Sequence, residues 1–102
     1  MSGYECSFES ELWEWDAQAS WYFVSLPERD ADEIAERSDG RARGFGSVRV
    51  EVTIGSSTWR TSVFPDAKKG TYVLPVKKAV RSKEAIGPGS TVFVALVTLD
   101  PG

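Results

Sequence analysis

The sequence predicts a mainly β fold: a small antiparallel β-barrel of about six strands capped by two short α-helices. Three observations indicate this class. Residues 47–54 alternate apolar and polar side chains, as a half-buried strand does. Residues 90–99 are apolar at both parities, so we expect them to lie in the middle of the sheet. No rhythm of alternating strands and helices appears before residue 71, which favours strands that pair with their sequence neighbours.

The chain of 102 residues is predicted to be a single domain spanning residues 1–102. Its 4 Trp, 3 Tyr and 5 Phe supply a large apolar area for one core. No stretch approaches the roughly 20 apolar residues of a membrane-spanning helix, and no secretory signal is evident. Cys6 is the single cysteine, which excludes an internal disulfide and favours a reducing compartment. We therefore expect a cytoplasmic protein without membrane contact.

The first half of the chain predicts two strands, a helix and a loop. Residues 4–16 form a long strand whose apolar parity switches near Leu12, which indicates either a bulge or bend there or a strand end that is buried on both faces. Residues 21–26 form a second strand, and the two are expected to make a hairpin with aromatic pairs across it. Residues 30–37 form an acidic helix with Ala31, Ile34 and Ala35 facing inward. Residues 38–46 form a loop.

The second half predicts another hairpin and then a strand–helix–strand unit. Strands 47–54 and 58–64 flank a turn at residues 55–57, and residues 65–70 form a loop. Residues 71–74 are β-formers. Pro75 suits the first turn of a basic helix, and Gly87 suits a left-handed residue that ends it.

The charges divide sharply along the chain. Residues 1–40 carry eleven carboxylates and two arginines, a net charge of −9, whereas residues 41–102 carry ten cations and four carboxylates, a net charge of +6. Such an asymmetry is found where a basic face binds a ligand. It is also found where acidic and basic segments lie against each other in the fold, and we expect this second arrangement for most of these charges.

The absence of histidine from the chain argues against most catalytic and metal-binding functions. Histidine is the commonest general base and metal ligand, and a zinc site would need Cys or His ligands. We therefore expect no metal, no cofactor and no catalytic residues. A small hydrolase or transferase would have to use the Ser62 or Thr61 hydroxyl with Lys69 or Lys77, and nothing in their spacing demands this.

Three segments together resemble a known family: Trp21–Pro27, Val48–Pro65 and Lys68–Leu96. Their order and spacing are similar to those of the bacterial Domain of Unknown Function 1905 family. The resemblance implies a double-split β-barrel capped by helices. It also implies that relatives occur alone or joined to a YdeI-like, bacteriocin-protection-type module. It implies no activity, because the family has none assigned.

Residues 74–94 also resemble, more weakly, the barrels of AbrB, MazE and MraZ-type proteins. Those proteins are largely transcription factors that dimerise by swapping or sharing strands. Because the likeness covers one helix and one strand, it supports the fold more than the function.

The candidate ligand-binding residues come from three groups. A basic patch around Lys68, Lys69, Lys77, Lys78 and Arg81 would bind a small anion, or would simply be a solvated surface. A second group comprises Arg41, Arg43 and Phe45 of one loop, beside Trp59 and Arg60. Trp59 would either stack on a ligand or pack over the mouth of the barrel. Aromatic residues would line an apolar pocket or, as we prefer, fill the core: Trp13, Trp15, Trp21, Tyr22, Phe23, Phe64 and Tyr72.

From these groups we select six predicted ligand-binding residues: Arg43, Trp59, Lys69, Tyr72, Lys77 and Arg81. The predicted function is a non-enzymatic binding or interaction module, with a small anionic molecule as the ligand. An alternative is an AbrB-like homodimer that binds nucleic acid, which the net charge of −3 disfavours. A third is a domain that docks partners through its hairpin edges.

Overall fold

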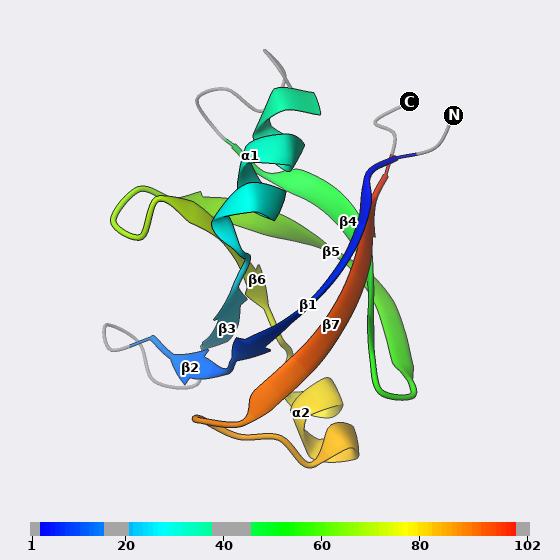
Figure 1. Ribbon diagram of the computed structural model, residues 1–102. Coiled ribbons are helices and arrows are strands. Elements are labelled where there is room, and N and C mark those ends of the chain that lie inside the picture. Colours follow the sequence, from blue (N-terminus) through cyan, green and yellow to red (C-terminus); the bar gives the residue numbers. More distant parts are fainter. Residues whose placement is uncertain (1–2, 16–20, 38–45, 100–102) are drawn as a thin grey trace.

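The computed structural model describes residues 3–15, 21–37 and 46–99 of the chain. These residues form a mainly β structure of seven strands and two helices, which confirms the predicted class (Figure 1). The elements are β1 (Glu5–Glu11), β2 (Trp13–Glu14), β3 (Tyr22–Ser25), α1 (Glu28–Arg37), β4 (Val48–Ile54), β5 (Ser57–Asp66), β6 (Thr71–Pro75), α2 (Lys78–Glu84) and β7 (Thr91–Thr98). The predicted turn at residues 16–20 and nearly all of the predicted loop at 38–46 lie outside the described residues.

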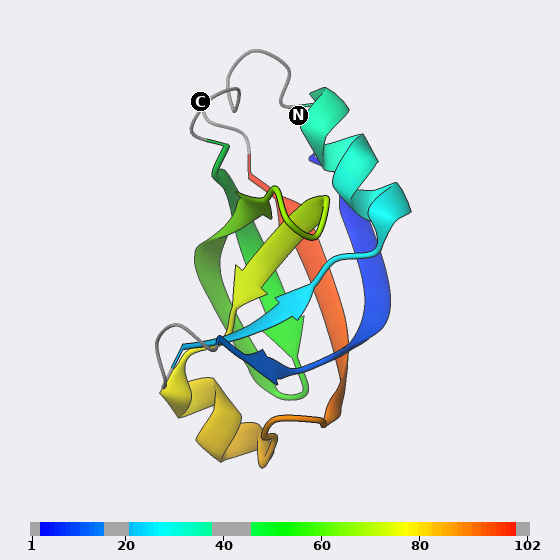
Figure 2. The same cartoon turned by 90° about the vertical axis from the view of Figure 1, so that its left-hand side faces the viewer.

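The strands make one antiparallel sheet in the order β1-β7-β4-β5-β6-β3-β2, curled into a half-barrel (Figure 2). β1 and β2 follow each other in the chain but occupy opposite ends of this order, because the chain bends at Leu12 between them. The bend is fixed by two backbone hydrogen bonds: the Leu12 amide donates to the Ser90 carbonyl (2.9 Å), and the Gly89 amide donates to the Leu12 carbonyl (2.8 Å). The predicted bend near Leu12 is confirmed.

The hairpin predicted between residues 4–16 and 21–26 is only partly correct. β2 pairs with β3, with Trp13 opposite Phe23, but β1 pairs along its whole length with β7. β7 lies between β1 and β4, so the prediction that this strand is central is correct. Its outer face is open all the same, since Phe93 is 58% exposed.

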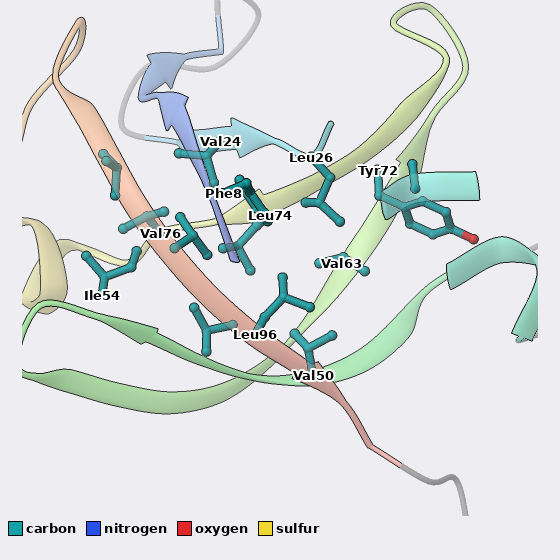
Figure 3. Packing of buried hydrophobic residues seen from close by; sticks show 14 of the residues in the cluster. Phe8, Val24, Leu26, Val50, Ile54, Val63, Tyr72, Leu74, Val76 and Leu96 are labelled. Carbon is teal, nitrogen blue, oxygen red and sulfur yellow. The ribbon is translucent and has the colours of Figure 1, made fainter. Parts of the chain in front are cut away.

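The core fills the concave side of the curled sheet with aliphatic side chains from β3 to β7 (Figure 3). Val24, Val50, Val63, Leu74 and Val94 are fully buried there. Burying a side chain of this size stabilises the fold by about 1.5–3 kcal/mol. The core is therefore made largely of aliphatic residues, and most of the aromatic ones lie elsewhere.

α1 begins at Glu28, two residues before the predicted start, and the Ala31 amide donates to the Pro27 carbonyl (2.9 Å). Ala31 and Ile34 are buried as predicted, but Ala35 is exposed, so its placement on the inner face was wrong. The helix contacts β6 and lies at the end of the barrel opposite α2 (Figures 1 and 2).

The predicted start and end of the basic helix are both corrected. Pro75 is the last residue of β6, paired with Phe23, and Lys77 is the residue that precedes the first helical turn of α2. The helix ends at Ala85, which takes the left-handed conformation (φ +56°) expected of Gly87. The Ile86 amide there donates to the Arg81 carbonyl (3.0 Å), which satisfies an end of the helix without glycine.

The predicted loop at residues 65–70 is shorter in the structure. β5 continues to Asp66, where Pro65 pairs with Tyr72 and Asp66 with Thr71. The remaining turn is held by Asp66, whose carboxylate accepts hydrogen bonds from the amides of Lys68 (3.1 Å) and Lys69 (3.3 Å). Gly70 closes the turn with φ +70°, a conformation that L side chains rarely adopt.

Candidate functional site

Two neighbouring surface grooves contain most of the predicted binding residues. The first, which we call the α2 groove, has a volume of about 430 Å³ and lies between α2, the end of β6, β5 and the start of β3. The second, the β2 groove, has a volume of about 630 Å³ and lies between β2, β3, β6 and the turn after β5. The predicted basic patch is therefore divided: Lys68 and Lys69 line the β2 groove, whereas Lys77, Lys78 and Arg81 line the α2 groove.

The α2 groove brings together three of the six predicted residues, Trp59, Lys77 and Arg81. Trp59 has the same parity on β5 as the buried Val63, and it both packs partly against the core and lines the groove. The two interpretations of Trp59 that the sequence left open are thus compatible.

Arg81 is held in the α2 groove by two contacts. Its Nε donates a 3.1 Å hydrogen bond to the Val76 carbonyl, and its Cζ lies 3.8 Å from the centroid of the Tyr22 ring. Both contacts leave the remaining guanidinium N–H groups as donors. A guanidinium stacked on an aromatic ring is pre-organised to bind a carboxylate or a phosphate through two parallel hydrogen bonds.

The wall of the α2 groove combines cations with aromatic rings. The cations are Arg60, Lys77, Lys78 and Arg81, and the rings are Trp21, Tyr22 and Trp59. Among the described residues that line this groove there is no carboxylate. Arg60 has a carboxylate near it, Glu51 at 3.5 Å, on the outer side of the β4–β5 hairpin. The groove therefore offers positive charge beside flat apolar surfaces.

The β2 groove carries mixed charge beside its aromatic rings. Its rings are Trp13, Trp15 and Phe23, and its charged residues are Glu14, Asp66, Lys68 and Lys69. Lys69 lies over the face of Trp13, with Nζ 4.6 Å from the ring centroid, and Trp13 Nε1 donates to Ser25 Oγ (3.0 Å). Lys69 thus contributes to a different groove from Lys77 and Arg81.

Tyr72 does not line either groove. Tyr72 is buried in the core, and burial raises the pKa of its hydroxyl. Its selection as a ligand-binding residue is not supported by this position. Arg43 lies outside the described residues, as do Arg41 and Phe45 of the same predicted group.

The preference for aromatic residues as core filling was wrong for most of the group. Trp15 (44% exposed), Trp21 (47%) and Phe64 are exposed, and Trp13 and Phe23 lie outside the core cluster. The signal that distinguishes them is parity: Val24 points inward, so Trp21 and Phe23 have positions that point outward. Trp13 and Trp15 likewise have the parity opposite to the inward-facing Phe8.

A third groove, on the outer face of β1, β7 and β4, is lined by Glu5 and Glu51 with small and apolar residues. Its carboxylates make it unsuitable for an anion. Across the described parts of the chain, no cluster of three or more His, Cys, Asp or Glu side chains could hold a metal ion. Thr61 and Lys77 share the α2 groove, whereas Lys69 lies in the other one.

The two ends of the molecule carry opposite charge. α1 is acidic and α2 is basic, and they lie at opposite ends of the barrel (Figures 1 and 2). In the described ranges, the salt bridges Arg37–Glu33 (3.6 Å) and Arg60–Glu51 (3.5 Å) each stay within one half of the chain. The expected arrangement of acidic against basic segments is therefore not what the two helices adopt.

In the described ranges, no helix is long and apolar enough to cross a membrane.

No curated protein matches the sequence. A family model does match it, from residue 8 to residue 96, and the model is that of a domain of unknown function. The matched segment contains both grooves, the bend at Leu12 and the basic helix. The chain belongs to the DUF1905 family.

Proposed function

We propose that this protein is a non-enzymatic binding module whose α2 groove takes a small anion that carries an aromatic ring. The observation that carries the proposal is the composition of the groove wall: four cations and three aromatic rings, with no carboxylate among the described lining residues. A ring of the ligand would stack on Trp21 or Trp59, and its anionic group would accept hydrogen bonds from Arg81 and the lysines.

The proposed ligand class follows from the two features of the groove wall, its cations and its aromatic rings, because one ligand should contact both. Inorganic phosphate would use the cations alone, and a neutral aromatic molecule would use the rings alone. An aromatic phosphate or carboxylate, of which adenosine monophosphate is a convenient probe, would use both. We therefore expect adenosine monophosphate to bind more tightly than either adenosine or phosphate.

The experiment is a titration of the isotope-labelled protein with adenosine monophosphate, adenosine, phosphate and benzoate, followed by amide chemical shifts. We expect shifts for residues 76–81 and 59–61 with the monophosphate, and weaker shifts with its two parts. Replacement of Lys77 and Lys78 by Gln should weaken binding about tenfold or more, since each lost charge-assisted hydrogen bond contributes about 1.5–3 kcal/mol in protected sites and less in exposed ones. Unmoved amides in both segments would remove the proposal.

The chain offers matched controls on the same elements. Lys83 is exposed on α2 and does not line the groove, so Lys83→Gln should leave binding unchanged. Trp21→Ala removes a ring on which the ligand would stack. Phe93 is an exposed ring on β7, away from either groove, so Phe93→Ala is the control for that variant. Equal losses in the control and groove variants would show that net charge or general apolarity, rather than the groove, governs binding.

A further inference from the structure

The outer face of β2 and β3 carries aromatic rings that the core does not use. Phe23 lies at the centre: its ring centroid is 5.1 Å from Trp13, 6.4 Å from Trp15 and 6.2 Å from Trp21. The Trp15 amide donates to the Trp21 carbonyl (2.9 Å), so these two exposed rings belong to paired strand ends. Four large rings thus form a continuous apolar surface on the outside of the sheet.

This surface joins the two grooves. Trp21 lines the α2 groove and Phe23 lines the β2 groove, and their rings are stacked with an interplanar angle of 21°. Phe23 also pairs with Pro75, which lines the α2 groove. A ligand longer than one ring can therefore pass from one groove to the other without leaving aromatic surface.

Cations lie at both ends of this aromatic surface. Lys68 and Lys69 line the β2 groove, and Lys77, Lys78 and Arg81 line the α2 groove. Of the carboxylates in the β2 groove, that of Asp66 accepts hydrogen bonds from the amides at 68 and 69, which directs it into its own turn; Glu14 is the other. The acidic helix α1 lies at the far end of the barrel (Figure 1). The positive charge therefore follows the rings.

We propose that this track binds a short single-stranded nucleic acid, with bases stacked on the exposed rings and phosphates beside the lysines and Arg81. The inference rests on the proposed function, because it makes the aromatic anion of the α2 groove one nucleotide of a strand. Proteins that bind single strands without sequence preference combine a positive groove with aromatic stacking platforms in this way. A duplex hides the faces of its bases, so it would use the cations without the rings.

The experiment measures fluorescence anisotropy of a fluorescein-labelled thymidine oligonucleotide of about 12 residues at low salt, a length above the lower range of single-strand site sizes. We expect it to bind at least tenfold more tightly than a thymidine mononucleotide, to outcompete a duplex of the same length, and to weaken as salt rises. Trp15→Ala and Trp21→Ala should each weaken binding about tenfold, because each removes one stacking ring. Phe93→Ala should leave it unchanged.

Each other outcome has a defined meaning. If mononucleotide and oligonucleotide bind equally, the single-strand inference is overturned and the proposed function stands. If a duplex or inorganic polyphosphate binds as tightly as the single strand, charge alone is responsible and the inference is again overturned. If the tryptophan variants fold poorly, Lys68→Gln with Lys69→Gln tests the same track: a loss for the oligonucleotide but not for the mononucleotide supports it, and no loss contradicts it.

Discussion

The hydroxyl of Tyr4 donates a 2.7 Å hydrogen bond to Oδ1 of Asp30, which ties the start of β1 to the first turn of α1. Asp30 is 7% exposed, and it is the one charged residue that is buried in the described part of the chain. The Arg37 guanidinium lies over the same tyrosine ring, 5.2 Å from its centroid. Tyr4 is thus held by both ends of α1. The hydrogen bond to Asp30 raises the pKa of Tyr4 to about 12, since it favours the neutral hydroxyl.

Replacing Tyr4 with Phe should lower the free energy of unfolding by about 1–3 kcal/mol, because it leaves a buried carboxylate without this donor. Urea unfolding at neutral pH measures the loss. Asp30→Asn and the double variant complete a double-mutant cycle. Strictly additive losses would show that the bond does not couple the two residues.

Replacing Ala85 with Gly should raise the free energy of unfolding by about 1 kcal/mol. Ala85 takes φ +56°, where an L residue other than glycine is disfavoured by roughly 1–2 kcal/mol, and glycine gives back part of that gain as unfolded-chain entropy. Thermal unfolding followed by far-ultraviolet circular dichroism is the measurement. Gly87→Ala is the matched variant, since a Cβ there meets no atom within 4 Å and the residue does not have positive φ. A destabilised Ala85→Gly variant would contradict the assignment of the helix end.

The end of α2 illustrates what the sequence does and does not predict about this fold. Residues 87–89 carry the strongest glycine and proline signal, and it marks the correct region, but the chain leaves the helix two residues earlier. There Ala85 takes the left-handed conformation and the Ile86 amide donates to the Arg81 carbonyl, a local helix end that the low preference of alanine for this conformation does not predict. The misplacement of Pro75 has a different cause, because its place in β6 depends on pairing with Phe23, which lies far away in the sequence.

Strand parity was the most reliable guide to which face of the sheet a side chain occupies, and this holds even for the tryptophans, where another argument was preferred to it. It predicted the inward face of β4 and the bend at Leu12. It also assigned the tryptophans at 13 and 15 to the face opposite Phe8, but the expectation that side chains fill a small barrel favoured a core assignment over that parity. The division of the basic patch into two grooves depends on the pairing of β5 with β6, which sequence spacing alone does not reveal.

Glu84 links α2 to the turn of the β4–β5 hairpin, and this link should make stability depend on acidic pH. Its Oε2 accepts hydrogen bonds from Ser57 Oγ (2.7 Å), Ser56 Oγ (3.1 Å) and the Ser56 amide (3.3 Å). The Ser57 hydroxyl, foremost among these donors, lowers the pKa of Glu84 below its ordinary value of 4.5. The folded state therefore binds this proton less readily than the unfolded state does.

A lowered folded pKa gives stability that is complete above the ordinary value and is lost as pH falls through the folded value. Glu84→Gln should therefore be less stable than the parent chain at neutral pH, and the difference should shrink below about pH 4.5. Urea titrations at several pH values test this. Ser57→Ala removes the main donor and should reproduce the effect in part. A difference that does not vary with pH would show that the carboxylate charge has no role.

Cys6 should be an unreactive thiol in the folded protein. Burial, and next the nearby Asp30 carboxylate, raise its pKa to about 12, so the thiolate that attacks electrophiles is scarce at neutral pH. Near pH 8 the fraction of thiolate is lower than in the unfolded chain by roughly three orders of magnitude, given an ordinary pKa of 9.0. The rate of reaction with a disulfide reagent, compared in buffer and in concentrated urea, measures the ratio. Asp30→Asn should raise the folded rate, because it removes the neighbouring negative charge while leaving burial in place. Equal rates in buffer and urea would show that Cys6 is accessible as a thiolate, which would contradict the burial of its thiol beside Asp30.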